Sequence, residues 1–156
     1  MAHDIHLRRI IEADLQLVYE LVQNTIQVSY SDIFPPEAIE FFKNYHSKES
    51  ILNDAANGYV VVAEASGQML GTGTLLVTNV RRVFISPGHQ RKGIGKIIVQ
   101  ELERKAESEG LSKLDISSTL KSKPFWEAEG YVPVGEFFLP VSNERKLIFY
   151  EMSKTL

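Results

Sequence analysis

Glycines and basic side chains come together in one short segment, which is the part of this sequence best suited to chemistry. It consists of Gln90, Arg91, Lys92, Gly93, Ile94, Gly95 and Lys96. An apolar stretch precedes it and a helical pattern follows it. A turn that opens a helix leaves backbone N–H groups free to bind an anion, and glycines let a phosphate approach them. The segment therefore suits phosphate, although it also fits an ordinary solvated helix start.

Two common phosphate motifs do not match this segment. Gly88 and Gly93 have the spacing of a Walker loop, but Ile94 and Gly95 follow where lysine and a metal-binding hydroxyl are needed. A dinucleotide fingerprint needs a further glycine three positions after Gly95, where this chain has Ile98. The remaining pattern is Gln/Arg-x-x-Gly-x-Gly/Ala, which residues 90–95 match.

The elements that must position this segment follow from periodicity and turn residues. Strands are expected at residues 6–10, 59–64, 71–77, 80–85, 114–118, 131–138 and 147–152, with tight turns at Ser66-Gly67 and Thr78-Asn79. Helices are expected after the caps Asp14 and Ser47, after Pro35-Pro36, and around Phe125 and Trp126. A long helix should bury Ile94, Ile97, Ile98, Leu102 and Ala106 and end at Gly110. This order predicts a mixed α/β sheet, with residues 80–85 as a central strand.

Length and composition narrow the classes further. A chain of 156 residues is expected to form one domain, residues 1–156. Without cysteine it has no disulfide, thiolate nucleophile or cysteine zinc site, and we expect no metal. The net charge of −3 argues against nucleic acid as a partner. No apolar run is long enough for a membrane span and the N-terminus does not look like a signal peptide, so a cytoplasmic protein is expected.

Residues 90–95, preceded by the sequence Val-Phe-Ile-Ser-Pro at 83–87, resemble the coenzyme A loop of the GNAT superfamily of N-acetyltransferases. Residues 114–119 resemble the strand of that family that follows the long helix, and residues 124–131 resemble its next short helix. Residues 149–154 resemble its last strand. The resemblance implies a mostly antiparallel central sheet flanked by helices, with splayed central strands. It also implies direct transfer of an acetyl group from acetyl-CoA to an amine.

The resemblance assigns a set of residues to acetyl-CoA. The main chain of Val83, Phe84 and Ile85 would pair with the pantetheine arm. The loop would hold the pyrophosphate, mostly through N–H groups, and Thr119 and Phe125 would lie near the cofactor. The complete set is Val83, Phe84, Ile85, Gln90, Arg91, Lys92, Gly93, Ile94, Gly95, Lys96, Thr119 and Phe125.

The catalytic residues do not follow from the resemblance. Trp126 stands where the family has a tyrosine that protonates the departing thiolate, and its indole N–H is too weak an acid for that step. Asn79 stands near the position of the carboxylate base and cannot take a proton. Glu64, and after it Asp115, are the substitutes for the base, and Ser118, a water or another tyrosine for the acid.

In the family the acceptor enters between the first helices and the last strands. Tyr30, Asp32 and Phe34 are the candidate substrate-binding residues there, and Glu37, His46, Phe137 and Phe138 lie in the same regions. Asp32 and Glu37 favour a small amine, an amino acid or a peptide N-terminus, although both also suit simple helix capping. A non-enzymatic acyl-CoA-binding module and a protein lysine acetyltransferase are the alternatives. Many members pair through their last strands, so the resemblance allows a homodimer.

Overall fold

The computed structural model describes residues 4–142 and 145–156, so the expectation about the signal peptide rests partly on residues outside that range. The strands are β1 (His6–Arg9), β2 (Tyr59–Ala65), β3 (Gln68–Leu76), β4 (Asn79–Ile85), β5 (Lys113–Thr119), β6 (Val132–Ser142) and β7 (Arg145–Thr155). The helices are α1 (Leu15–Tyr30), α2 (Pro36–Tyr45), α3 (Lys48–Asn57), α4 (Ile94–Ser108) and α5 (Lys123–Ala128). Two 3₁₀ turns, η2 (Glu12–Asp14) and η3 (Pro87–His89), complete the list.

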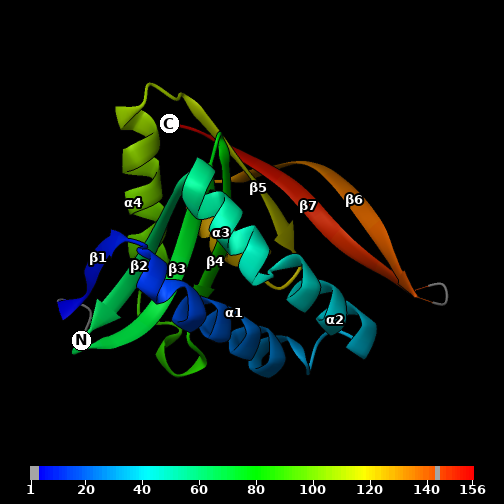
Figure 1. The fold of residues 1–156 in the computed structure, drawn as a ribbon. Helices are drawn as coiled ribbons and strands as arrows, with labels where there is room; N and C mark the ends of the chain where they lie inside the picture. Colours follow the sequence, from blue (N-terminus) through cyan, green and yellow to red (C-terminus); the bar gives the residue numbers. More distant parts are fainter. Residues whose placement is uncertain (1–3, 143–144) are drawn as a thin grey trace.

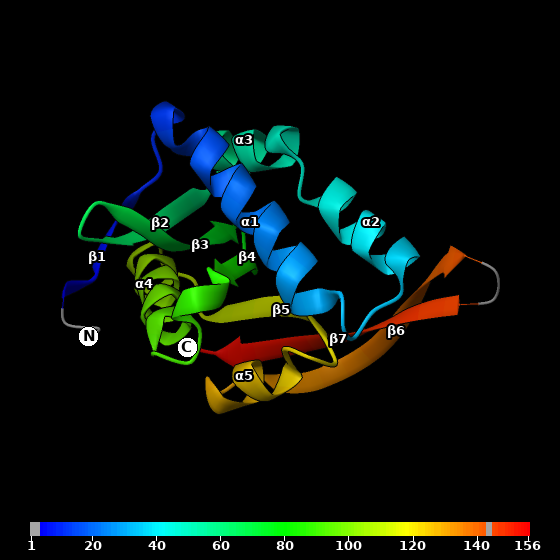
Figure 2. The ribbon, with the colours of Figure 1, turned by 90° about the horizontal axis from the view of Figure 1, so that it is seen from below.

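All seven strands form one sheet in the order β1-β2-β3-β4-β5-β7-β6. Every neighbouring pair is antiparallel except β4 and β5, which are parallel. Helices α1, α2 and α3 cover one face of the sheet, and α4 and α5 cover the other (Figures 1 and 2). The predicted mixed, mostly antiparallel sheet flanked by helices is confirmed, with β4 at its centre.

Each face of the sheet has its own apolar core. The core under α4 contains Val61, Leu114, Ile116 and Met152 from the sheet, and the core under α1 and α2 contains Val62, Phe84 and Leu147. Strand β2 contributes to both because its central residues alternate between the faces. The sheet is therefore buried on both sides where its strands cross the middle of the molecule.

Helix α4 lies close against β3 because glycines leave room for it. A side-chain Cβ at Gly73 would collide with Ile98 of the helix, and one at Gly71 would meet Phe84 and Ile85. The helix buries Ile94, Ile98, Val99, Leu102, Glu103 and Ala106. Ile97 is only half-buried, so the predicted face was wrong at that residue, and Val99 takes its place. Gly110, with φ of +82°, ends the helix as predicted.

Two local predictions need correction. Asp14 precedes α1 as expected but does not cap it, because its carboxylate accepts hydrogen bonds from Arg8 and from the backbone N–H of Ile11 instead. The turn between β3 and β4 lies at residues 77–78, one residue earlier than predicted, and Val77 has a φ of +56°. The cap by Ser47 is confirmed, since its Oγ accepts from Ser50 N at 3.1 Å.

A β-bulge in β4 changes the side of the sheet on which the side chains after it lie. Thr72 pairs with Phe84 and Thr74 with Arg81, so two residues of β4 lie opposite one residue of β3. Arg82, in the bulge, has a φ of +55°. Val80 therefore packs in the core under α4, whereas Phe84 packs in the core under α1 and α2. Strict alternation would have put Val80 and Phe84 on the same face.

Strands β4 and β5 separate soon after they meet. Their register contains a single pair, Asn79 with Asp115, within the described part of the chain. Figure 1 shows the two strands diverging from that point toward their C-terminal ends. The splay leaves an opening in the middle of the sheet, and several of the predicted site residues line it, among them Val83, Phe84 and Thr119.

Candidate functional site

A cavity of about 550 Å³ occupies the opening between β4 and β5. Its wall includes Val80, Val83 and Trp126, which belong to or pack on the core under α4. It also includes Tyr30, Phe42 and Phe84 from the core under α1 and α2. Because residues of both cores line one cavity, the cavity connects the two faces of the sheet.

At the end of β4, the loop presents its backbone at the start of α4. Gly93 is the N-cap residue with a φ of +83°, and no side chain caps the helix. A Cβ at Gly93 would have nothing within 4 Å, so the space beside it is open. Arg91 also has a positive φ, +62°, and the side chains of Arg91, Lys92 and Lys96 are exposed. Free N–H groups, a helix dipole and three cations together suit a pyrophosphate.

The loop is fastened to the rest of the fold through Gln90. Its Nε2 donates to the carbonyl of Ile85 at 3.0 Å and to Ser29 Oγ at 3.2 Å. The side chain thus ties the loop to the end of β4 and to α1. Ile94 is buried in the core under α4, so only its main chain is available to a ligand.

Of the residues assigned to acetyl-CoA, Val83, Phe84 and Thr119 line the cavity, whereas Ile85, the loop residues 90–96 and Phe125 do not. A Cβ at Gly95 would lie 3.1 Å from the ring of Phe125, so the glycine and the ring are in close contact. Thr119 is buried and lines the cavity, and its Oγ1 lies 3.1 Å from Ser122 Oγ. Ser118 does not line the cavity; its Oγ donates to the Thr119 carbonyl and lies 2.9 Å from Ser122 Oγ. Ser118 therefore reaches the cavity only through Ser122.

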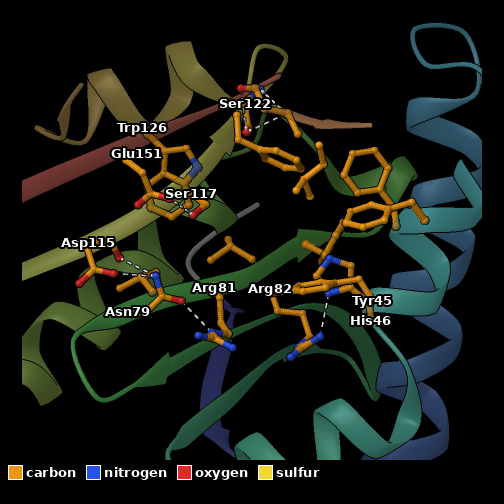
Figure 3. Close-up of a pocket in the computed structure, with 18 of the residues that line it drawn as sticks. Tyr45, His46, Asn79, Arg81, Arg82, Asp115, Ser117, Ser122, Trp126 and Glu151 are labelled. Carbon is orange, nitrogen blue, oxygen red and sulfur yellow. Dashed lines mark hydrogen bonds between the residues drawn. The ribbon is translucent and has the colours of Figure 1, made fainter. Parts of the chain in front are cut away.

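Polar side chains hold β4 and β5 together where the cavity begins. Asn79 Nδ2 donates to Asp115 Oδ1 at 2.8 Å, and Thr78 Oγ1 donates to Asp115 Oδ2 at 2.8 Å. Arg81 Nε in turn donates to Asn79 Oδ1 at 2.7 Å (Figure 3). Asn79 thus links the two strands. Asp115 lines the cavity, and so does Glu151 of β7, which accepts a hydrogen bond from Ser117 at 2.7 Å.

A buried charged group lies in the cavity wall that α2 covers. Arg82 Nη2 donates to Asp54 Oδ2 at 2.5 Å, and both side chains are less than 5% exposed. Arg82 Nη1 lies 2.7 Å from His46 Nδ1 (Figure 3). Because the guanidinium can only donate, Nδ1 of His46 is the acceptor and its proton lies on Nε2. Burial, and then the charges of Arg82 and Arg81, lower the pKa of His46 to about 3.

Sequence reasoning missed this group. The sequence placed His46 only in the region of the acceptor, with no partner; in the structure it is buried, neutral and part of the cavity lining. The signal was present, because His46 lies four residues after Phe42 and eight after Ala38, both buried on α2. Asp54 likewise lies three residues after the buried Ile51 on α3.

The lowered pKa of His46 predicts how stability depends on pH. In the unfolded chain the imidazole titrates near 6.5, whereas in the folded protein it stays neutral to about pH 3. The contribution of His46 to the free energy of unfolding is therefore complete above pH 6.5. It is lost as the pH falls toward 3, because in that range the unfolded chain binds a proton that the folded protein does not. Urea unfolding from pH 7.5 to 4.5 should show a steeper loss of unfolding free energy in the wild type than in His46→Gln. The exposed His6→Gln should keep the wild-type slope, and equal slopes in all three proteins would contradict the assignment.

Glu64 lies away from the cavity. It is on β2 and forms an ion pair with Arg8 at 3.0 Å, and Arg8 also pairs with Asp14. The hydrogen bond from Arg8 lowers the pKa of Glu64, which makes its carboxylate a weaker base. Glu64 does not line the cavity, so the structure does not bring it together with the other candidates.

The structure separates the three residues expected to bind the acceptor. Tyr30 lines the cavity. Phe34 packs on Tyr30 and Phe42, with ring centroids 5.4 and 5.3 Å away, and does not itself line the cavity. Asp32 is exposed and outside the lining. Glu37 is also outside the lining, so neither expected acidic residue lies at the cavity.

Trp126 packs in the interior of the protein. It is 6% exposed, and its ring makes edge contacts with Phe125 at 5.0 Å and Tyr131 at 5.2 Å. One part of it also lines the cavity.

Among residues 4–142 and 145–156, no three His, Asp or Glu side chains converge as a metal site. Within the same residues, no helix has the length and apolarity needed to cross a membrane.

Comparison with known proteins gives one family and many similar folds. The family model described as an acetyltransferase (GNAT) domain matches residues 30–156. A GCN5-related N-acetyltransferase from Rhodopseudomonas palustris is similar with 18% identity and a TM-score of 0.87, covering 97% of this chain and 95% of that one. The PaiA N-acetyltransferase from Thermoplasma acidophilum, solved with coenzyme A, has 19% identity, a TM-score of 0.78 and coverages of 97% and 99%.

The ribosomal-protein-S18-alanine N-acetyltransferase from Escherichia coli is a third similar structure. It has 14% identity and a TM-score of 0.73, and the match covers 97% of this chain and 93% of that one. At such identities, likeness to the solved structures shows the fold alone. A search of curated proteins finds no match.

Proposed function

The chain belongs to the GNAT family of N-acetyltransferases, and on that premise we propose that it transfers an acetyl group directly from acetyl-CoA to a primary amine. The acceptor in this proposal is a small molecule, an amino acid or a peptide. One observation carries it: a cavity joins the two faces of the sheet beside a loop built to bind an anion. The donor can therefore lie along the loop and β4 while the acceptor approaches from the side of α1 and α2.

The residues that would hold acetyl-CoA are those of the loop and of the free edge of β4. The loop N–H groups and the cations Arg91, Lys92 and Lys96 suit the pyrophosphate. The main chain from Val83 to Ile85 has no strand partner on the β5 side in the described register and so can pair with the pantetheine amides; the Ile85 carbonyl also accepts from Gln90 Nε2. Thr119 lines the cavity, and the ring of Phe125 lies against Gly95 of the loop.

The chemistry needs a neutral amine, a stabilised oxyanion and a proton for the departing thiolate. In our proposal a main-chain N–H of β4 donates to the oxyanion. Asp115 and Glu151 are the carboxylates in the cavity lining, so one of them, directly or through a water, takes the proton from the amine nitrogen. The C–N bond forms as the C–S bond breaks, and the thiolate is protonated by a water or through the Ser118–Ser122 hydroxyl pair.

The experiment is a calorimetric titration with acetyl-CoA, followed by an amine screen for thiol release in the same buffer. Binding with release for some class of amine is the expected result. Binding without release across a broad panel would favour the acyl-CoA-binding module, and release only with lysine-containing proteins would favour the lysine acetyltransferase. No binding would overturn the proposal. A homodimer, a single domain over residues 1–156 and a cytoplasmic location remain predictions.

Replacing Trp126 by phenylalanine should lower stability more than turnover. The indole fills the space between Phe125 and Tyr131, and a smaller ring leaves part of that space empty. Large-to-small changes of this kind in a core cost about 1–3 kcal/mol. Urea unfolding and steady-state rates with the best amine would measure both effects. A loss of rate above tenfold at unchanged stability would show that Trp126 takes part in the reaction.

A further inference from the structure

The polar side chains on the acceptor side of the cavity are hydrogen-bond donors. Arg81, Arg82, His46 and Tyr30 all line this part of the wall. His46 donates through Nε2, since its Nδ1 accepts from Arg82. Burial raises the pKa of Tyr30 to about 12, so its hydroxyl keeps its proton. Within the described residues, neither the Nε2 of His46 nor the Tyr30 hydroxyl has a hydrogen-bond partner.

Of the two arginines, only Arg81 has a charge that is not balanced by a neighbour. Arg82 is paired with the buried Asp54. Arg81 bonds through Nε to the neutral Asn79, and no carboxylate of the described residues lies within ion-pair distance of its guanidinium. Arg81 is half-buried, so it is partly shielded from water where it lines the cavity. The terminal nitrogens of Arg81 are thus available to an anion.

Two further groups of residues in the cavity lining restrict what can bind there. The wall around these donors is aromatic, formed by Phe41, Phe42, Tyr45, Phe84, Phe137 and Phe149. The carboxylates Asp115 and Glu151 lie on the other side of the cavity from His46 and Tyr45 in Figure 3. Arg81 lies between these two sides, since its Nε donates to Asn79, which in turn donates to Asp115. The lining therefore offers a cation next to a carboxylate, further donors on the side of His46, and an aromatic wall.

Resting on the proposed function, we infer that the acceptor amine bears a carboxylate, which Arg81 binds with help from His46 and Tyr30. A guanidinium presents a planar fork of N–H groups that matches a carboxylate. The amine then lies toward Asp115 and Glu151, and the aromatic wall takes an apolar side chain. The acceptor class is an amino acid with an apolar or aromatic side chain, and the products are its N-acetyl derivative and free coenzyme A.

The test compares acceptors that differ only in the carboxylate: L-phenylalanine, L-phenylalaninamide and phenethylamine, and the leucine series in the same way. The expected result is a kcat/KM at least tenfold higher for an amino acid than for its amide. The amine of the amide is less basic than that of the amino acid, so a larger fraction of it is unprotonated and, without a carboxylate site, the amide should react faster. A preference for the amino acid therefore points to binding of the carboxylate. O-phosphoethanolamine is included to separate a carboxylate from a phosphate.

The variant Arg81→Gln removes the cation from the cavity, and Arg104→Gln removes one from the exposed surface of α4. Arg81→Gln should raise the KM for the amino acid roughly tenfold or more. Its effect on phenethylamine should be much smaller than its effect on the amino acid, acetyl-CoA should bind as tightly as to wild type, and Arg104→Gln should behave as wild type. Faster reaction of amides, equal losses for all amines, or preference for O-phosphoethanolamine would overturn the inference while leaving the acetyltransferase intact. No turnover of any amine would instead count against the proposed function.

Discussion

A protein in which valine replaces Gly93 is expected to bind acetyl-CoA about a hundredfold more weakly than wild type. Gly93 has a φ of +83° at the start of α4, a conformation that costs a non-glycine residue about 1–2 kcal/mol. A β-branched residue escapes this strain by rotating the backbone, which turns the N–H groups away from the pyrophosphate. Since the space beside Gly93 is open, the chain should still fold. Calorimetric titration and thermal unfolding measure the two effects.

The control for this variant is Gly110→Val at the opposite end of the same helix. Gly110 has nearly the same φ, +82°, and equally open surroundings, but no assigned ligand. It should lose comparable stability and keep its affinity for acetyl-CoA. If both variants keep wild-type affinity, the loop does not bind the pyrophosphate through its backbone.

Replacing Asp54 by alanine should lower the free energy of unfolding by about 3–5 kcal/mol, because it leaves the charge of Arg82 buried and unpaired. The cost is large because Arg82 Nε already has no partner and the side chain is almost completely enclosed. Urea unfolding at pH 7.5 gives the number directly.

A surface pair supplies the comparison for Asp54. Glu109→Ala removes the partner of Lys105 on α4, and such exposed pairs contribute about 0–1 kcal/mol. The double variant Asp54→Ala, Arg82→Met should be more stable than Asp54→Ala alone, since it removes the unpaired charge as well. A loss below 1 kcal/mol for Asp54→Ala would mean that water or another group satisfies Arg82.

The loop and the order of the elements could be predicted because their signals are local. The glycine spacing of residues 90–95, the caps and the changes of periodicity each lie within a few neighbouring residues. The acceptor side could not be predicted in that way. Arg82 meets Asp54 and His46 across sequence separations of 28 and 36 residues. Only the fold brings α2, α3 and β4 together. The sequence therefore could not show that Arg81 and Arg82, rather than the predicted Asp32 and Glu37, are the charged residues on the acceptor side of the cavity.

The bulge in β4 had no clear signal in the sequence either. An apolar strand such as residues 80–85 predicts two regular faces, and nothing in Arg81 or Arg82 requires a bulge. The bulge is seen only in the pairing with β3, where Thr72 lies opposite Phe84 and Thr74 opposite Arg81. The Ser66-Gly67 turn was predictable by contrast, since serine is common in turns and glycine readily adopts a positive φ such as the 76° of Gly67; Ser66 itself has a φ of 53°.

The splay of β4 and β5 gives this sheet two edges in its interior. Beyond the pair of Asn79 and Asp115, the amides of β4 that point into the opening have no strand to bond, although the strand lies at the centre of the fold. Hydrogen exchange should therefore be fast along this edge and slow on the side bonded to β3. The slowest-exchanging and some of the fastest-exchanging backbone amides of the sheet would then be neighbours on a single strand.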